Sequence, residues 1–160
     1  MPLKFFAETD VDPGEFFTWR EEGSEKIEVR VRRIPPAREK AIEFRHFGRK
    51  RRVTFSKGGA RQDLDIQKQE DVNREKASYC LVETKGFELE VAGPGAADQI
   101  GRLLSEKFEP GQVVSLDGKW TDALKDAMFD GLLDLVGWLA EKVEKLSDRD
   151  QQEDEEALGN

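Results

Sequence analysis

The sequence has few of the residues on which most catalytic and metal sites depend. Its 160 residues include one cysteine, Cys80, and one histidine, His46. A single cysteine excludes a disulfide within the chain, and the two residues cannot supply the cysteine and histidine ligands of an ordinary zinc site. Free cysteine without disulfides suits the reducing cytosol, so we expect a cytoplasmic protein.

Neither residue has the neighbours that catalysis requires. His46 lies among arginines in the segment Phe44–Gly48, and nearby positive charge lowers the basicity of an imidazole. Cys80 stands between Tyr79 and Leu81, as a small buried hydrophobic residue would. We therefore assign neither residue a catalytic role, and we predict a protein that is not an enzyme and needs no cofactor or metal.

The chain also lacks a long hydrophobic run. The first twelve residues, MPLKFFAETDVD, contain only a short apolar cluster, which is too short for a signal peptide or for a helix that crosses a bilayer. Hydrophobic residues make up 37% of the chain and charged residues 38%. We expect a folded centre with solvated ends and no membrane association.

Charge is abundant, and it is segregated along the chain. The formal net charge is −8, from 26 basic and 34 acidic residues. Residues 1–25 hold two bases against seven acids, a net charge of −5, and residues 26–61 hold thirteen bases against three acids, a net charge of +10. The last twenty residues hold three bases against eight acids, again −5. The basic middle must therefore be neutralised by the acidic ends or by a partner.

Hydrophobic periodicity predicts an α+β fold that is mainly α-helical, with short N-terminal strands or a hairpin, then helices, and a long C-terminal helix. Alternating apolar residues indicate a strand over 26–34, and the two prolines that follow it begin a helix that ends at Gly48. The later elements that we expect are a strand at Val53–Phe55, a helix over 64–84, a strand over 87–91, a helix after Gly95 that reaches Phe108, and an extended segment over 112–116.

The clearest predicted element is a closing helix with Thr121 as its N-cap. Apolar residues recur at helical spacing from Leu124 to Leu146. So broad a stripe suits the core of the domain and, in part, a surface for a partner chain. The strongly acidic end of the chain suggests a flexible tail. We therefore divide the chain into an acidic N-terminal segment (1–25), a single globular domain (26–146) and an acidic tail (147–160).

Two groups of residues are candidates for binding a partner. One is the basic cluster of segment 45–61, which would suit an acidic protein surface; a nucleic acid is the alternative, since phenylalanines nearby could stack on bases. The other is the apolar stripe of the closing helix with the tryptophan before it. The candidates are Arg45, Arg49, Lys50, Arg51, Arg52, Trp120, Phe129, Leu132, Val136, Trp138 and Leu139.

Three short motifs follow one another in a distinctive order. A strand rich in valine and arginine, Ile27–Ile34, leads through two prolines into a charged helix. A segment that ends in Gly86-Phe87 comes next, and the segment Leu116–Thr121 then opens the long final helix. This order resembles the small tail assembly chaperones of long-tailed bacteriophages and prophages, and the likeness covers residues 26–146.

The resemblance implies a non-enzymatic protein of the bacterial host cytoplasm. Such a chaperone coats the tape-measure protein during tail assembly, keeps its long hydrophobic helices soluble, recruits tail-tube subunits and leaves the finished particle. The resemblance also implies self-association. Two alternatives remain open: a structural subunit that stays in the phage tail or neck, and a nucleic-acid-binding regulator that uses segment 45–61.

Overall fold

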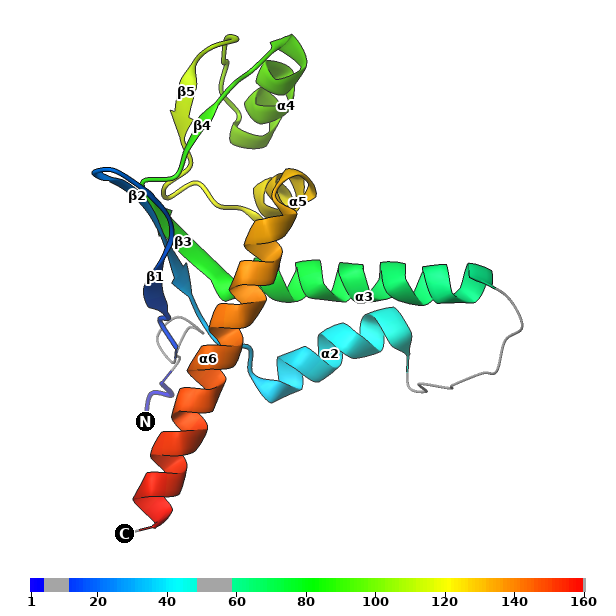
Figure 1. The fold of residues 1–160 in the computed structure, drawn as a ribbon, viewed down its shortest axis with the longest axis vertical. Helices are drawn as coiled ribbons and strands as arrows, with labels where there is room; N and C mark the ends of the chain where they lie inside the picture. The colour runs from blue at the N-terminus through cyan, green and yellow to red at the C-terminus, as the bar shows by residue number, and fades with distance from the viewer. Residues whose placement is uncertain (5–11, 49–58, 160) are drawn as a thin grey trace.

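The computed structural model describes residues 1–4, 12–48 and 59–159, with the backbone alone over 59–65 (Figure 1). The elements follow in the order β1 (Glu15–Glu22), β2 (Glu25–Val31), α2 (Pro36–Phe47), α3 (Gly59–Cys80), β3 (Leu81–Lys85), β4 (Glu88–Glu90), α4 (Pro94–Leu104), β5 (Val113–Ser115), α5 (Asp122–Gly131) and α6 (Leu133–Leu158). The predicted α+β class, with N-terminal strands and a long C-terminal helix, is confirmed.

The main sheet is antiparallel and has the strand order β1-β2-β3. β1 and β2 form a hairpin whose turn includes Gly23, at φ +62°, and β3 adds to the other edge of β2 after the long excursion through α2 and α3. On β2 the side chains alternate as the sequence predicts: Val29 and Val31 are fully buried. Arg30 between them forms an ion pair of 2.8 Å with Glu83 of β3.

The core lies where the main sheet meets α5, α6 and the end of α3. Its fully buried side chains come from segments far apart in the sequence: Val29, Val31, Leu81, Leu116, Leu124, Phe129, Leu135 and Leu139. Two helical arms extend from this core (Figure 1): α2 and α3 lie side by side and project away from the sheet, and α6 runs past the sheet toward the C-terminus. No helix of the described ranges has the apolar length that a membrane crossing requires.

The segment between Lys85 and Thr121 forms a smaller unit at one end of the molecule (Figure 1). β4 and β5 pair antiparallel, with Leu89 opposite Val114, which confirms the predicted strand and the predicted extended segment. α4 packs beside them with Ala97 and Ile100 buried. The predicted strand Val53–Phe55 lies outside the described residues.

The N-terminal part differs from the prediction. Residues 1–25 were expected to form an acidic segment outside the domain, but β1 belongs to the main sheet. Its aromatic residues explain this position: Phe17 packs edge to face on Trp138 of α6, with ring centroids 6.5 Å apart, and Trp19 stacks on Phe87 at 5.7 Å. The seven acidic residues dominate the net charge of this segment. Net charge does not show whether the single aromatic side chains among them are buried.

The helix predicted over 64–84 ends earlier, at Cys80, and the chain continues as β3. Val82 and Thr84 are β-branched, which favours a strand, and Val29 of β2 lies opposite Thr84 in the sheet. The pairing of β3 with β2 decides where α3 ends and β3 begins. Since β2 is some fifty residues away in the sequence, local periodicity could not locate it.

The predicted closing helix is two helices. Thr121 caps α5 as expected, with its Oγ1 accepting a hydrogen bond of 3.2 Å from Leu124 N. The helix then breaks at Leu132, where φ is −126° and ψ is 60°. Gly131 before the break has low helix propensity. The break redirects the chain so that apolar residues of both α5 and α6 reach one core.

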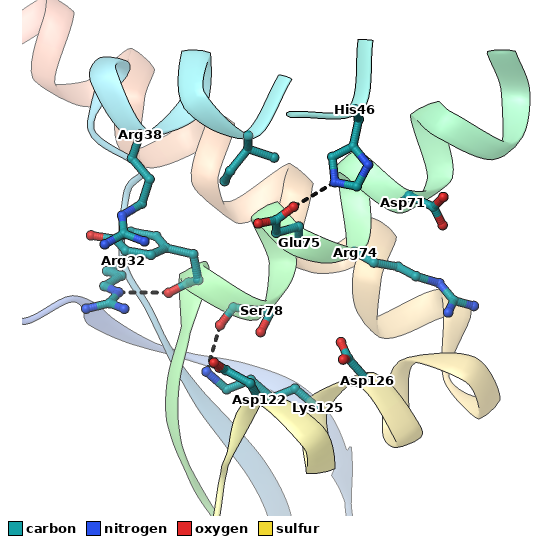
Figure 2. A pocket seen from close by; sticks show the side chains of 12 residues that line it. Arg32, Arg38, His46, Asp71, Arg74, Glu75, Ser78, Asp122, Lys125 and Asp126 are labelled. Atoms are coloured by element: carbon teal, nitrogen blue, oxygen red, sulfur yellow. Dashed lines mark hydrogen bonds and ion pairs between the residues drawn. The ribbon is translucent and has the colours of Figure 1, made fainter. Parts of the chain in front are cut away.

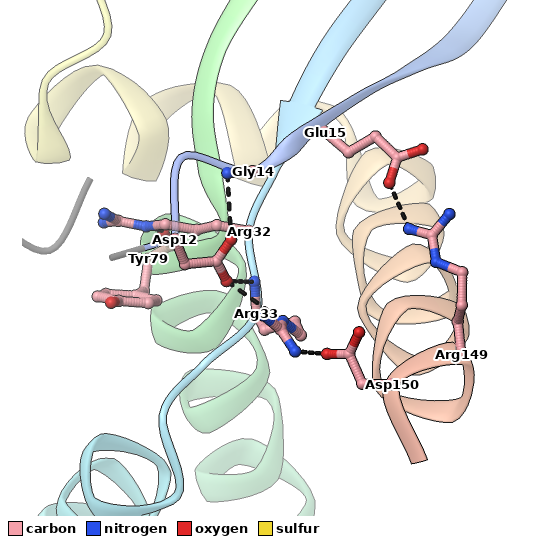
Figure 3. Close-up of polar contacts among 8 residues, drawn as sticks. All are labelled: Asp12, Gly14, Glu15, Arg32, Arg33, Tyr79, Arg149 and Asp150. Atoms are coloured by element: carbon pink, nitrogen blue, oxygen red, sulfur yellow. Dashed lines mark hydrogen bonds and ion pairs between the residues drawn. The ribbon is translucent and has the colours of Figure 1, made fainter. Parts of the chain in front are cut away.

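The segment 147–160, predicted as a flexible tail, is helical as far as Leu158, because α6 continues to that residue. Leu146 is buried, and polar contacts follow it on the next turn of the helix. Arg149 pairs with Glu15, and Asp150 pairs with Arg33 (Figure 3). These tertiary contacts favour the helical state over the solvated coil that composition alone predicts.

Candidate functional site

Arg45 is the one member of the predicted basic cluster that the structure describes. Arg49, Lys50, Arg51 and Arg52 lie outside the described residues. Arg45 is exposed near the end of α2, and its guanidinium forms an ion pair with Glu75 of α3. The Nε2 atom of His46 lies 2.7 Å from the other oxygen of the Glu75 carboxylate. Glu75 thus ties two basic side chains of α2 to α3.

The predicted apolar residues lie in or against the core. Phe129 and Leu139 are fully buried, so they have no surface to offer a partner in this conformation. The half-buried ones that pack against the core are Trp120, Leu132, Val136 and Trp138. Trp120 is held by its indole N–H, which donates to Thr84 Oγ1 at 2.8 Å. The apolar stripe is therefore used largely within the chain.

A polar cleft of about 660 Å³ lies between α2, α3 and α5 (Figure 2). Its walls carry charges of both signs. The cationic side chains that line it are Arg32, Arg38, Arg74 and Lys125, and the anionic ones are Asp71, Glu75, Asp122 and Asp126. Because four bases face four acids, the cleft has no strong preference for a ligand of one charge.

Lys125 forms the floor of this cleft, and it is only 8% exposed. Its Nζ donates to the carbonyl oxygens of Ser78, at 2.6 Å, and Leu81, at 2.7 Å. Burial lowers the pKa of Lys125, which Asp122 partly offsets. The two carbonyls belong to the C-terminal end of α3 and the residue after it, where cations are favoured. Lys125 therefore joins α5 to the end of α3.

Tyr79 lies at one end of the cleft between two arginines. The guanidinium carbons of Arg32 and Arg38 lie 3.9 and 4.4 Å from the centroid of its ring, within the range of cation–π attraction. Arg32 Nε also donates to the Tyr79 carbonyl oxygen at 2.8 Å. The side chains at this end are therefore used in packing α2, α3 and β2 together.

Cys80 is buried at the same end of α3. Burial raises the pKa of its thiol to about 12, although the charges of Arg32 and Lys125 act in the other direction. A thiol with this pKa stays protonated at neutral pH, and the thiol form is a poor nucleophile. The structure therefore places Cys80 where the sequence suggested, as a buried apolar side chain. In the parts of the chain that the structure describes, no cluster of acidic, histidine or cysteine side chains could hold a metal ion.

The acidic ends of the chain meet the basic middle in a polar network (Figure 3). One carboxylate oxygen of Asp12 accepts from Arg33 N at 3.2 Å and from Arg33 Nε at 3.3 Å, and the other accepts from Gly14 N. The guanidinium of Arg33 also pairs with Asp150 of α6. The sequence did not single out these carboxylates, because residues 12, 33 and 150 come together only in the folded chain.

Two of the short sequence motifs meet at Asp117. Its Oδ2 accepts a hydrogen bond from Gly86 N at 2.7 Å, and its Oδ1 accepts from Phe87 N at 3.1 Å and from Thr84 Oγ1 at 2.8 Å. The segment Leu116–Thr121 is thereby attached to the turn after β3. The contact is structural, and it joins the two motifs in the folded chain.

A second hollow, of about 370 Å³, lies between α3 and α6. Its apolar lining includes Ala77 and Cys80 of α3 with Val136 and Val143 of α6. Of the predicted binding residues, it contains Val136 and Leu139. The sequence could not reveal this groove, because helical periodicity shows which face of a helix is apolar but not which helix lies beside it.

Comparison of the chain with protein-family models, with curated proteins and with solved structures gives no match. In the polar cleft, His46 of α2 pairs with Glu75 of α3, and Lys125 of α5 bonds the Ser78 carbonyl oxygen of α3, whereas the groove has an apolar surface with a charged edge. Both arrangements are typical of packing and protein contact.

Proposed function

We propose that this chain is a non-enzymatic assembly chaperone, similar to the tail assembly chaperones of long-tailed phages. In this proposal it binds the tape-measure protein and tail-tube subunits during tail morphogenesis. The observation that carries the proposal is the shape of the molecule, in which two helical arms extend from a small core (Figure 1). At 1.5 Å per residue, the 26 residues of α6 alone span about 39 Å.

Extended helical arms suit the binding of an elongated helical partner. An amphipathic helix is commonly recognised by laying its apolar stripe along a groove between helices, and the hollow between α3 and α6 offers such a surface. A chaperone of this kind also keeps its hydrophobic partner soluble. The net charge of −8 supports this role, because like charges keep a complex with a hydrophobic partner from aggregating.

The chemistry of the single histidine and cysteine also supports a binding protein. The Nε2 atom of His46 is bonded to the Glu75 carboxylate, which also pairs with Arg45, and Cys80 is a buried, protonated thiol and therefore a poor nucleophile. The nucleic-acid alternative has less support at Arg45, the basic residue of segment 45–61 whose side chain the structure describes, because Arg45 is paired with a carboxylate of the same chain.

Co-expression tests the proposed function. The chain is produced together with the product of the neighbouring tape-measure gene, and we expect that product to become soluble and to co-purify with the chain. An unrelated helical protein that aggregates when expressed alone is the control for specificity. No gain in solubility and no co-purification of the tape-measure product would contradict the proposal.

Mass spectrometry of purified phage particles separates the chaperone from a structural subunit. A chaperone leaves the finished particle, so we expect peptides of the tube protein and none of this chain. Recovery of the chain in amounts comparable to the tube protein would instead identify a subunit of the tail or neck.

A further inference from the structure

The charged side chains of the polar cleft between α2, α3 and α5 are not evenly mixed along its length. Tyr79 and Asp71 of α3 lie at opposite ends of the cleft. Eight residues of helix separate them, which corresponds to about 12 Å. Arg32 and Arg38 lie at the Tyr79 end, and Asp126 lies toward the Asp71 end (Figure 2). Equal numbers of acids and bases in the whole cleft therefore do not mean equal numbers at each end.

The Tyr79 end of the cleft is positive. The guanidinium carbons of Arg32 and Arg38 lie 3.9 and 4.4 Å from the centroid of the Tyr79 ring. The buried Lys125 belongs to the same end, because its Nζ donates to two carbonyl oxygens at the end of α3. Asp122 is the anionic side chain that lines this end. Three cations and one anion leave two positive charges.

The Asp71 end of the cleft is negative. Its two basic side chains are already paired, because Arg74 forms an ion pair of 2.5 Å with Asp130 of α5 and His46 is bonded to Glu75. The carboxylates of this end that form no ion pair with any side chain the structure describes are those of Asp71 and Asp126. These two carboxylates leave two negative charges about 12 Å from the positive end.

A ligand with opposite charges at its two ends matches this distribution. A dicarboxylate would place one anion beside Asp71 and Asp126, and a diamine would place one cation beside Arg32 and Arg38, so each would meet like charge at one end. A zwitterion meets the opposite charge at both ends. Its own charges must be about 12 Å apart, and an extended peptide of four residues spans ~13 Å between its termini.

The middle of the cleft also suits a peptide. Ile42 lies one helical turn from both Arg38 and His46 on the wall formed by α2, where it offers apolar contact to a small side chain. The hydroxyl of Ser78 both donates and accepts hydrogen bonds, as the amide groups of a peptide require. The volume of about 660 Å³ lies within the roughly 300–1,000 Å³ of ligand pockets in proteins.

We propose that the cleft binds a short oligopeptide of about four residues, with its terminal carboxylate at Arg32 and Arg38 and its terminal ammonium at Asp71 and Asp126. A guanidinium has five N–H donors, so the bond from Arg32 Nε to the Tyr79 carbonyl oxygen leaves others for the carboxylate of the peptide. The inference goes beyond the proposed function, because this site needs no tail protein and does not use the groove between α3 and α6.

Isothermal titration calorimetry of the full chain with tetra-alanine in low salt tests the site. We expect saturable binding of one peptide per chain. N-acetyl-tetra-alanine lacks the ammonium and tetra-alanine amide lacks the carboxylate, so each should bind at least ~10-fold more weakly, as expected when a charge-assisted hydrogen bond is lost. No binding of tetra-alanine at millimolar concentration, or equal affinity for the three peptides, would overturn the proposal.

Two substitutions test which end of the cleft holds which end of the peptide. Arg38→Gln should weaken the binding of tetra-alanine by at least ~10-fold but leave that of tetra-alanine amide unchanged, because the amide has no carboxylate to lose. Asp126→Asn should weaken the binding of tetra-alanine similarly and leave that of N-acetyl-tetra-alanine unchanged. If either variant weakened the binding of all three peptides equally, the proposed orientation would be wrong.

Arg102→Gln and Asp98→Asn on α4 are the matched controls, because they make the same changes of charge outside the cleft. We expect both to bind tetra-alanine as the wild type does. Losses equal to those of the cleft variants would show that the overall charge of the chain controls binding, and would overturn the proposed site. Circular dichroism establishes that each variant is folded. The test uses this chain and synthetic peptides, so its failure leaves the proposed function unaffected.

Discussion

At the scale of single residues, Cys80 and Lys125 show how burial acts on groups of different charge. Burial disfavours the charged form of each, so it raises the pKa of the thiol and lowers that of the ammonium. Cys80 stays neutral and packs in the core. Lys125 has backbone carbonyls as hydrogen-bond partners at 2.6 and 2.7 Å. These bonds replace the hydrogen bonds to water that its ammonium group loses on burial.

The thiol of Cys80 should be unreactive in the native protein. We expect iodoacetamide at pH 8 to label the folded chain far more slowly than the chain in denaturant, because burial both blocks access and raises the pKa to about 12. Mass spectrometry over time measures the labelling. Equal rates in the two conditions would contradict the buried position.

The raised pKa of Cys80 also predicts a pH dependence of stability. The ordinary pKa is 9.0 and the folded value is about 12, so the native state holds the proton more tightly than the unfolded state. The thiol's contribution is therefore complete below about pH 9 and is lost as the pH rises toward 12. In urea unfolding, Cys80→Ala should remove this part of the alkaline decline.

Replacing Lys125 should be costly. Lys125→Met retains much of the apolar stem but leaves the carbonyl oxygens of Ser78 and Leu81 without a donor, and we expect the free energy of unfolding to fall by about 2–3 kcal/mol. Lys107→Met at an exposed position is the control and should change it by less than about 0.5 kcal/mol. Urea unfolding measures both variants. Equal losses of unfolding free energy would show that the hydrogen bonds of Lys125 do not stabilise the fold.

At the scale of elements, a few polar contacts determine where helices and strands meet. Asp117 accepts three hydrogen bonds from the end of β3 and the turn after it, and Thr121 caps α5. Gly86 occupies the turn at φ +76°, close to the backbone of β2. These contacts hold the smaller unit of β4, β5 and α4 against the main sheet.

Gly86→Ala should destabilise the chain more than Gly118→Ala. Both glycines have positive φ, +76° and +73°, so an added Cβ strains both backbones by about 1 kcal/mol. At Gly86 the Cβ would also collide with the carbonyl oxygen of Lys26, whereas at Gly118 it would meet open space. We expect about 1–3 kcal/mol more loss at Gly86, as for other overpacked sites, measured by urea unfolding. A larger loss at Gly118 would contradict the packing.

The C-terminal turns of α6 should depend on Arg33. Arg33→Gln removes the base that pairs with both Asp12 and Asp150, so we expect faster amide hydrogen exchange over residues 147–158 in low salt. High salt should reduce the difference from the wild type, because screening weakens exposed ion pairs. Arg102→Gln on α4 is the control and should leave exchange in α6 unchanged. Unaltered exchange in Arg33→Gln would show that the network does not hold the helix.

At the scale of the whole molecule, the three charged segments of the sequence come together. Asp12 belongs to the first acidic segment, Arg33 to the basic middle and Asp150 to the acidic end, and one network joins them. Part of the basic middle is thus neutralised within the chain. The arms remain extended, since α6 and the pair α2–α3 leave the core in different directions (Figure 1).

The extended arms predict a large radius of gyration. A compact chain of 160 residues has a radius of about 15 Å, and we expect small-angle X-ray scattering of the monomer to give a clearly larger value. Measurement over a dilution series, extrapolated to zero concentration, avoids any contribution from association. A radius of about 15 Å would show that the arms fold back on the core.

Local pattern was sufficient for elements whose cause is local. Alternation identified β2, and the hydroxyl of Thr121 identified the start of α5. The environment of Cys80 also agreed with its neighbours in the sequence, whereas His46 contacts the Glu75 carboxylate of α3, which its neighbours in the sequence do not reveal. The sequence did not locate the groove between α3 and α6, nor did it separate core from surface among Phe129, Val136 and Leu139.

The sequence by itself determined the fold class, the apolar faces of the helices and the separation of charge, because each of these depends on residue type and spacing. Only the tertiary structure decided where each element begins and ends and which neighbour its apolar face packs against. It added β1 to the sheet, ended α3 at Cys80, broke the closing helix at Leu132 and extended α6 to Leu158. The physical reason is that strand pairing, core packing and ion pairs such as Arg149 with Glu15 join residues far apart in the chain, and their free energy outweighs local preference.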